Sequence, residues 1–280
     1  MNLTSPSQVK AWCIENGFHP NKVMGQNFLI DRNALEVIVE TGLAEAGSAP
    51  HVLEIGPGLG VLTEEMLRRG AAVLAIEKDP VLAARLAAAL DHPSRLRVIA
   101  GDALAWSAAD SAGRALLEGD DPVSPPPDLM VSNLPYQAGT RILLELVRRR
   151  EFRRLTVLVQ TEVAERLAAG EGSKTRGLAG VWAQLDYDVK VVRKVAASCF
   201  WPRPEIGSSV VTLVRHDRNI AFSEEERKFF YDFTKTAFAH RRKQLGSVFK
   251  DMIKSTARAE ELSNEDWIQL VKGLTTDENA

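Results

Sequence analysis

The feature of this sequence that most constrains its fold is a regular alternation of apolar strand patterns and helical patterns between residues 52 and 168. Short apolar runs predict strands at residues 52–55, 72–76, 96–99, 129–131 and 155–160. Helical patterns follow them at residues 61–69, 80–90, 105–117, 140–150 and 161–168. Such alternation is typical of a parallel sheet with right-handed crossovers and helices on both faces. We therefore predict an α/β fold with a Rossmann-like sheet.

Polar or conformationally special residues stand where four of these strands end. Gly56 follows the first strand, Glu77 the second, Asp102 the third and Asn133 the fourth. Ligands of open parallel sheets bind beyond the carboxyl ends of the strands, so one cleft should collect these residues. Random placement would rarely produce this coincidence, and the joint pattern indicates a ligand site.

The fourth strand runs into an unusual segment, Ser132-Asn133-Leu134-Pro135-Tyr136. Pro135 fixes its own φ and restricts Leu134 to extended geometry, which leaves the Leu134 carbonyl free of a helix. Asn133 adds a side-chain acceptor, and Tyr136 adds a flat aromatic face. Two acceptors beside a stacking surface suit a planar ring with an exocyclic amino group, such as adenine or cytosine. Taken alone, the segment also fits a proline-terminated strand followed by a core tyrosine.

The loop after the first strand, Gly56-Pro57-Gly58-Leu59-Gly60, bears on the cofactor. It departs from the dinucleotide pattern GxGxxG, because Val61 stands where the third glycine belongs. A proline-containing loop preceded by Glu54 suits a smaller, cationic ligand, and S-adenosylmethionine fits. Glu77 lies about twenty residues after the glycines, where an acid takes ribose hydroxyls. Asp102 is placed to accept from the amino group of the cofactor's adenine.

Composition narrows the class of protein. Hydrophobic residues make up 45% of the chain and charged residues 26%, as in ordinary globular proteins. No apolar run approaches the roughly 20 residues that span a bilayer. Two distant cysteines, Cys13 and Cys199, and five scattered histidines form neither a disulfide framework nor a metal-ligand pattern. We expect no metal and no membrane contact, and a cytoplasmic setting because no signal-peptide pattern opens the sequence.

The net charge of −2 and the pI of about 6.3 argue against a protein that coats nucleic acid through bulk charge. Basic residues nevertheless cluster at Arg148-Arg149-Arg150, with Arg153 and Arg154, and again at Arg241-Arg242-Lys243. Either cluster can contact phosphates, and either can be a solvated helix end. Charge alone leaves both interpretations open.

The pattern changes after residue 170. Two late strands are predicted at residues 187–195 and 208–215, joined as a hairpin. Only helical patterns follow, at residues 223–239, 242–253 and 264–272, and Ser223 with Glu226 forms a capping-box start. We predict a sheet domain over residues 1–216 and a small helical domain over residues 217–280.

Four motifs together resemble the KsgA family, the ribosomal RNA adenine dimethyltransferases that act on small-subunit RNA. They are, in the family's order, Gly25-Gln26-Asn27-Phe28-Leu29, Glu54-Ile55-Gly56-Pro57-Gly58, Asn133-Leu134-Pro135-Tyr136 and Phe200-Trp201-Pro202-Arg203-Pro204. The resemblance runs from about residue 22 into the helical tail, including Arg241-Arg242-Lys243. The departures are Ser132 in place of a common glycine, Gly139-Thr140 in place of a Ser-Thr pair, and Arg176 where an aromatic residue is usual in a loop expected to face RNA.

The resemblance implies a class I methyltransferase sheet, S-adenosylmethionine as cofactor and immature small-subunit ribosomal RNA as partner. It assigns the cofactor contacts to Asn27, Leu29, Gly56, Glu77, Asp102 and Asn133. It assigns the clamp on the target base to Tyr136 and Phe200. We expect Asn133 and the Leu134 carbonyl, held by Pro135, to accept the hydrogens of the target amine, and Tyr136 to act through its ring rather than its hydroxyl.

Three alternatives share this fold. A large-subunit ribosomal RNA adenine methyltransferase is the nearest one among enzymes. DNA adenine methylation uses the same Asn-Pro-aromatic chemistry, but the sequence has no DNA-reading motif. A non-catalytic RNA-binding assembly factor would not need the intact Asn133 segment. Nothing in the sequence demands a dimer, so we expect a monomer.

Overall fold

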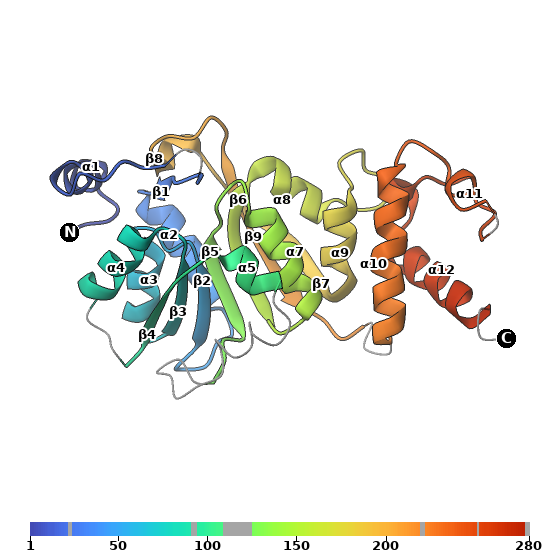
Figure 1. Cartoon of the computed structure of the whole chain (residues 1–280), viewed down its shortest axis with the longest axis horizontal. Helices are drawn as coiled ribbons and strands as arrows, with labels where there is room; N and C mark the ends of the chain where they lie inside the picture. Colours follow the sequence, from blue (N-terminus) through green and yellow to red (C-terminus); the bar gives the residue numbers. More distant parts are fainter. Residues whose placement is uncertain (22–23, 91–93, 109–124, 219–221, 251, 278–280) are drawn as a thin grey trace. The chain divides into compact units, whose positions relative to one another are not determined.

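A computed structural model describes residues 1–21, 24–90, 94–108, 125–218, 222–250 and 252–277 of the 280-residue chain (Figure 1). By the contacts between its residues, the chain divides into two compact units. Unit 1 comprises Met1–Ala164 and Lys190–Val214, and unit 2 comprises Glu165–Val189 and Arg215–Ala280. The functional division between residues 1–216 and 217–280 stays a prediction.

A seven-stranded sheet carries the fold, with strand order β4-β3-β2-β5-β6-β9-β7. The strands from β4 to β6 pair in parallel, and β9 runs antiparallel to β6. This confirms the predicted Rossmann-like sheet and both late strands. The strands are β2 (His51–Ile55), β3 (Ala72–Glu77), β4 (Leu96–Ala100), β5 (Leu129–Asn133), β6 (Arg154–Gln160), β7 (Tyr187–Val195) and β9 (Ser208–Arg215).

Helices lie on both sides of this sheet (Figure 1). Asp79 caps the helix α4 (Pro80–Ala89) by accepting hydrogen bonds from the backbone N–H groups of Val81 and Leu82. Pro80 occupies the first turn of this helix, where its missing N–H is not needed. The predicted helix at residues 105–117 starts at Ala103, and its residues from 109 onward lie outside the described part of the chain. The helices are α2 (Arg32–Gly42), α3 (Val61–Arg68), α4 (Pro80–Ala89), α5 (Ala103–Ala108), α7 (Gly139–Arg149) and α8 (Thr161–Ala168).

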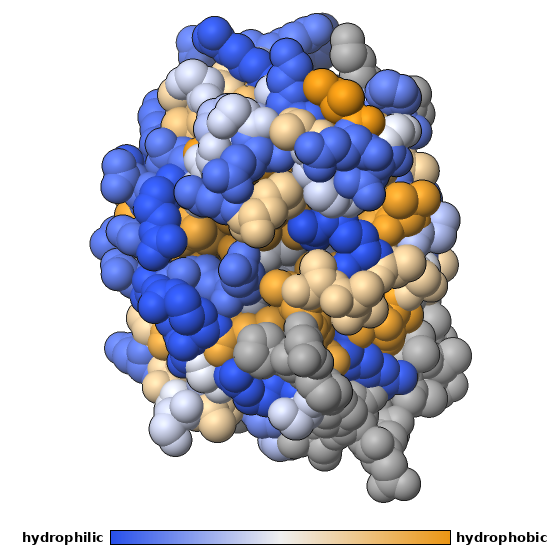
Figure 2. Space-filling model, turned by 90° about the vertical axis from the view of Figure 1, so that its left-hand side faces the viewer, coloured by the Kyte–Doolittle hydropathy of each residue, from blue (hydrophilic) through white to orange (hydrophobic). Residues whose placement is uncertain are grey.

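The central strands are buried on both faces. Every residue of β3 is buried, as are the first four residues of β5. Strands covered by helices on both sides read as continuous apolar runs rather than alternating ones, which is why their positions could be predicted. On the face seen in Figure 2, hydrophilic residues cover most of the surface, and apolar residues gather across its middle.

A second, two-stranded sheet in unit 1 was not predicted. Strand β1 (Phe28–Leu29) pairs antiparallel with β8 (Phe200–Trp201), so that Leu29 lies opposite Phe200. Strands of two residues have no detectable periodicity, so only the tertiary structure reveals them. The short 3₁₀ helix η1 (Ala197–Cys199) precedes β8, and the amino-terminal helix α1 (Pro6–Glu15) packs through Val9 and Cys13 in the same apolar cluster as Phe28.

Unit 2 is helical around a core of aromatic residues that includes Phe230, Phe233 and Trp267. Its elements are α9 (Leu178–Asp186), α10 (Glu224–Ala239), α11 (Leu245–Val248), η2 (Ala259–Glu261) and α12 (Asn264–Asp277). The predicted capping box of Ser223 and Glu226 opens α10. Helix α9 was missed by the sequence analysis.

The predicted helix at residues 242–253 is wrong, because among the described residues of this range only the four residues of α11 are helical. The backbone N–H of Leu245 donates to the carbonyl of Ala257, and that of Gly246 donates to the carbonyl of Ser255. These bonds hold the chain against the segment that follows it. The hydrogen bonds to Ser255 and Ala257 therefore form in place of the longer helix that the sequence pattern predicts.

Candidate active site

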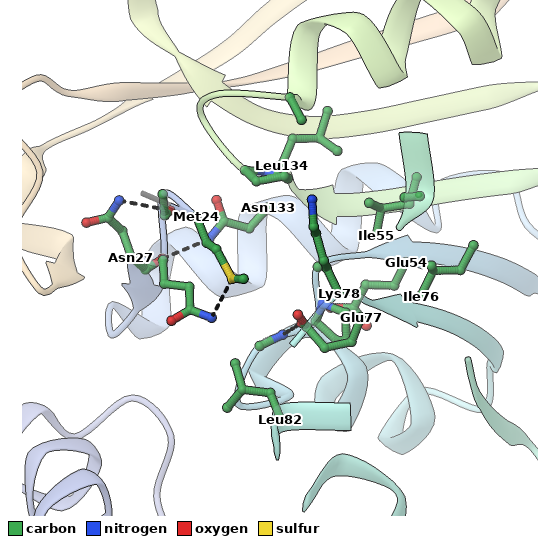
Figure 3. Close-up of a pocket in the computed structure, with 18 of the residues that line it drawn as sticks. Met24, Asn27, Glu54, Ile55, Ile76, Glu77, Lys78, Leu82, Asn133 and Leu134 are labelled. Atoms are coloured by element: carbon green, nitrogen blue, oxygen red, sulfur yellow. Dashed lines mark hydrogen bonds between the residues drawn. The ribbon is translucent and has the colours of Figure 1, made fainter. Parts of the chain in front are cut away.

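A cavity of about 380 Å³ lies at the carboxyl ends of β2, β3 and β5 (Figure 3). Its volume falls in the range of small-molecule sites, which is about 300–1,000 Å³. The predicted site residues that line it are Asn27, Leu29, Gly56, Glu77, Asp102, Asn133, Leu134, Pro135 and Tyr136. The structure thus brings together the residues that the sequence placed at the ends of separate strands.

Glu77 is held between the glycine loop and the start of α4. Its Oε2 accepts from the backbone N–H of Gly58, and its Oε1 accepts from that of Asp79, both at 2.9 Å. The side chain is buried, and burial raises its pKa, while the two N–H groups act in the opposite direction. Gly58 has a φ of +58°, and a Cβ there would lie 3.1 Å from the ring of Phe28. Only glycine lets the loop come this close.

Glu54 is a second buried carboxyl group in the same cavity, with 1% of its surface exposed. The hydroxyl of Thr63 donates to its Oε2 at 2.6 Å. Burial raises the pKa of Glu54 to about 8; the Thr63 hydrogen bond lowers it and the charge of Glu77 raises it. Two buried acids in one cavity favour a positively charged ligand. A sulfonium compound with an ammonium group, such as S-adenosylmethionine, fits a cavity that contains these two carboxyl groups.

Asp102 lies nearer the surface. Its Oδ2 accepts from the ammonium group of Lys78 at 2.8 Å, and its Oδ1 accepts from the backbone N–H of Leu104 at 2.9 Å. The Lys78 hydrogen bond lowers the pKa of Asp102. Lys78 also lines the cavity and was not predicted, although its place directly after Glu77 at the end of β3 was a signal that could have found it.

The Asn133 segment presents two free acceptors. The side-chain Nδ2 of Asn133 donates to the backbone carbonyl of Asn27 at 3.2 Å, so its Oδ1 is directed elsewhere (Figure 3). The backbone N–H of Leu134 donates to the carbonyl of Leu158 at 3.1 Å. Within the described residues, no hydrogen bond ends on Asn133 Oδ1 or on the Leu134 carbonyl oxygen. The site can therefore receive two N–H hydrogens.

Two sequence departures at this segment have structural roles. The buried hydroxyl of Ser132 accepts from the backbone N–H of Ile55 at 2.9 Å and so ties the end of β5 to β2. A Cβ on Gly139 would lie 2.8 Å from the Cβ of Leu134. The absence of a side chain at Gly139 therefore allows α7 to begin directly against Leu134.

The aromatic ring of Tyr136 is half-buried and lines the cavity, which excludes the interpretation as a core tyrosine. Its hydroxyl lies 2.7 Å from the hydroxyl of Ser208. Burial raises the pKa of Tyr136, so the phenol is neutral at physiological pH. Ser208 carried no sequence signal, because it lies 72 positions away in another strand.

Phe200 does not line the cavity. It is 2% exposed and packs in the main apolar core, opposite Leu29 in the small sheet. Its neighbour Trp201 stacks on Phe28, with ring centroids 6.5 Å apart. The role of Phe200 as the second half of the base clamp stays a prediction.

Arg176, which replaces the usual aromatic residue of its loop, has a side chain that is only 1% exposed. Its guanidinium donates to the carbonyl of Ala169 at 2.9 Å and to the Oδ1 of Asn264 at 2.7 Å. The residue therefore fastens its loop to α12 inside unit 2. Both terminal nitrogens of the guanidinium find acceptors, whereas the buried Nε has no hydrogen-bond partner among the described residues.

Neither a metal-ligand cluster nor a membrane-spanning helix is found in the described residues. No group of three or more His, Cys, Asp or Glu side chains there is placed to hold a metal ion. No helix in the same residues has the length and apolar character needed to cross a membrane.

Comparison with known proteins identifies relatives along nearly the whole chain. A family model described as Ribosomal RNA adenine dimethylase matches residues 17–276. The Ribosomal RNA small subunit methyltransferase A of Deinococcus radiodurans is 41% identical over 255 residues, which cover 89% of this chain and 79% of the relative. The protein of the same name from Opitutus terrae is 34% identical over 257 residues, with 90% and 86% covered.

Solved structures share the fold. A dimethyladenosine transferase from Plasmodium falciparum superposes with a TM-score of 0.71 at 21% identity, covering 89% of this chain and 98% of the other. The 23S rRNA methyltransferase ErmE superposes with a TM-score of 0.65 at 23% identity, covering 89% and 100%. The family match over residues 17–276 and the relatives at 34% and 41% identity establish that the chain belongs to the ribosomal RNA adenine dimethylase family.

Proposed function

We propose that the protein is an S-adenosylmethionine-dependent ribosomal RNA (adenine-N6,N6)-dimethyltransferase that acts on small-subunit RNA during ribosome biogenesis. The observation that carries this proposal is the pair of free acceptors, Asn133 Oδ1 and the Leu134 carbonyl, in a cavity that also holds Glu77. The names of the relatives at 34% and 41% identity support the same substrate.

The cofactor would be held by the residues at the strand ends. Glu77 has oxygens fixed by two backbone N–H groups and would take the ribose hydroxyls. Asp102 would accept from the adenine amino group, and Glu54 would favour the positive charge. Asn27, Leu29 and Gly56 complete the surface on which the cofactor lies. When bound, the cofactor supplies an activated methyl group.

The target amine is a poor nucleophile, because its lone pair is delocalised into the adenine ring. Asn133 Oδ1 and the Leu134 carbonyl would accept its two hydrogens. Acceptors directed in this way favour the pyramidal nitrogen that develops in the transition state. No strong general base is required, since the methylated nitrogen is acidic enough to release its proton to water. A second round requires only that the pocket admit a monomethylated amine.

Positioning of the base falls to Tyr136, whose ring would stack on it. An adenine inside folded RNA must first be splayed out, and single-stranded loops offer it most readily. Pro135 keeps the backbone of Leu134 extended while the base is held. A purely non-catalytic assembly factor would have no need of these oriented acceptors.

Contact with RNA phosphates is proposed for Arg242 and Lys243 in unit 2, whose side chains are exposed. Arg241 has another role: its guanidinium donates to the backbone carbonyl of Lys174 and lies 3.5 Å from the carboxylate of Glu260. Within the cluster, Arg241 thus contacts other residues of unit 2, whereas Arg242 and Lys243 are exposed cations. We also propose that the protein acts as a monomer in the cytoplasm.

The test offers labelled cofactor with immature small and large ribosomal subunits and digests the RNA to nucleosides. Dimethyladenosine in the small subunit is the expected result, with Asn133→Ala as the inactive control. Label confined to the large subunit would instead identify large-subunit RNA as the substrate. The only present support for that alternative is the similarity of the fold to that of ErmE. Absence of label from both subunits, with intact cofactor binding, would favour the assembly factor.

A further inference from the structure

We propose that Ser208 is a positioning residue that fixes the ring of Tyr136 for stacking on the target base. The inference rests on the proposed function, because the base in question is the adenine to be methylated. The two hydroxyl oxygens lie 2.7 Å apart, within hydrogen-bond distance, and either group can donate. Tyr136 follows β5 and Ser208 opens β9, so the bond joins the mouth of the site to a different strand of the sheet.

Ser208 is a rigid anchor. It has no exposed surface, and it lies opposite Gln160 in the antiparallel pairing of β6 with β9. The preceding carbonyl, that of Gly207, accepts from the backbone N–H of Thr161 at 3.1 Å. The backbone on both sides of Ser208 is therefore held by hydrogen bonds, which fixes the Cα from which the hydroxyl projects.

Tyr136 is fixed at its other end by packing and by backbone bonds. A Cβ on Gly25 would lie 3.3 Å from the backbone nitrogen of Tyr136, so the two segments are in close contact. The carbonyl of Pro135 accepts from the N–H of Gly139 at 2.7 Å. With the backbone held, the ring can still turn about its Cα–Cβ bond. A hydrogen bond at the hydroxyl restricts this rotation and so fixes where the ring lies, which a stacking surface requires.

This assignment changes the expectation drawn from the sequence, in which only the ring of Tyr136 mattered. The hydroxyl is the only polar group of the Tyr136 side chain, and through it the ring forms a hydrogen bond to a strand of the sheet. Loss of either hydroxyl should therefore have the same consequence, which is a ring that is present but not oriented. The effect belongs to base binding and methyl transfer, and cofactor affinity should not change.

The chain offers a matched control in Ser209. It is the next residue of β9, is equally buried, and its side chain projects to the opposite face of the strand. Its hydroxyl lies 3.1 Å from that of Thr161 rather than near the cavity. Ser208→Ala and Ser209→Ala therefore remove the same atom from the same strand, and only the first removes the contact with Tyr136.

The test is a double-mutant cycle on the full chain, with single-turnover transfer to immature small subunits at saturating cofactor. We expect Ser208→Ala and Tyr136→Phe each to lower kcat/KM for RNA about fivefold to tenfold, as for one hydrogen bond. The double variant should lose no more than either single variant, and Ser209→Ala should remain near wild type. Additive losses, full activity of Ser208→Ala, or equal losses in the Ser209→Ala control would overturn the proposal.

A second measurement does not depend on activity. The chain has three tyrosines, so isotope-labelled tyrosine gives few NMR signals, and Tyr136→Phe identifies the one of Tyr136. Ser208→Ala should shift this signal and raise the pKa of Tyr136, because Ser208 lowers it. An unshifted signal would refute the positioning role. Wild-type protein that leaves small-subunit RNA unmethylated would instead refute the proposed function.

Discussion

The side-chain amide of Asn133 donates a hydrogen bond to the backbone carbonyl of Asn27, 3.2 Å away. The two residues are 106 positions apart, and the segment that contains Asn27 continues into β1, which pairs with β8. The orientation of the amide is therefore set from outside its own strand. Because the nitrogen faces Asn27, the oxygen is left as the acceptor for the target amine.

Replacing Asn133 by alanine removes one of two acceptors that act on the amine in the transition state. We expect Asn133→Ala to lower methyl transfer about a hundredfold to a thousandfold, as for loss of one oxyanion-hole donor. Cofactor binding, measured by calorimetry, should remain detectable. Retained turnover would contradict the assigned role.

Asn133→Asp is the informative companion variant. It keeps an acceptor oxygen, but its second oxygen faces the carbonyl of Asn27, and two acceptors repel one another. We expect this variant also to lose most of its transfer activity. Full activity would show that the hydrogen bond to Asn27 does not orient the group.

Truncation of the proposed stacking residue should weaken RNA binding. Tyr136→Ala should cost about 1–3 kcal/mol of base stacking. The measurement is RNA affinity by filter binding or anisotropy, with the cofactor dissociation constant as the control. Unchanged affinity for a splayed-out adenine would remove Tyr136 from the base site.

The buried carboxyl of Glu54 predicts a dependence of stability on pH. Its pKa is raised from 4.5 to about 8 in the folded protein, so the folded state keeps a proton that the unfolded state loses. The stability that this group contributes is fully present below pH 4.5 and is lost as the pH rises through about 8. Chemical denaturation of the cofactor-free protein across this window should show the decline.

Glu54→Gln should flatten that decline, because glutamine keeps an oxygen for the Thr63 hydroxyl and carries no titrating proton. Binding of the cationic cofactor should release a proton from the wild-type group near neutral pH. Calorimetry in buffers of different ionisation enthalpy measures this release. If the Glu54→Gln variant kept the pH profile of the wild type, Glu54 would not be the source.

Gly25 is expected to be sensitive to substitution for two separable reasons. Its φ is +67°, and an added Cβ would lie 3.3 Å from the backbone nitrogen of Tyr136. Gly25→Ala should therefore cost roughly 1–2 kcal/mol of backbone strain and also lower methyl transfer. Gly17 is the control, since its φ is +58° and nothing lies within 4 Å of an added Cβ. Equal activity losses in the two variants would argue against the Tyr136 contact.

The basic cluster of unit 2 should respond unevenly to alanine substitution. Arg242→Ala with Lys243→Ala should reduce the salt dependence of RNA binding by roughly one unit of slope per lost phosphate contact. Arg241→Ala should mainly lower thermal stability, because it releases the loop at Lys174 and the carboxylate of Glu260. Binding isotherms at several salt concentrations separate the two. An unchanged slope in the double variant would mark these residues as solvated surface.

Much of the fold could be predicted because its central strands are buried on both faces. The apolar runs ending at Glu77 and Asn133 marked β3 and β5, and the glycine loop after β2 marked the turn into α3. Parallel order then placed these ends at one edge. The sequence pattern did not predict helix α9. The helix predicted at residues 242–253 was wrong, because backbone hydrogen bonds to Ser255 and Ala257 form there instead.

The sequence by itself determined the main sheet, the family and most of the residues at the cavity, since these follow from local patterns and from the ends of parallel strands. Tertiary structure alone decided the direction of the Asn133 amide, the tie between Tyr136 and Ser208, and the burial of Phe200 and Arg176. Each of these depends on a hydrogen bond or packing partner far away along the chain. Residue type tells what a side chain can donate or accept, and only the fold determines which partner it meets.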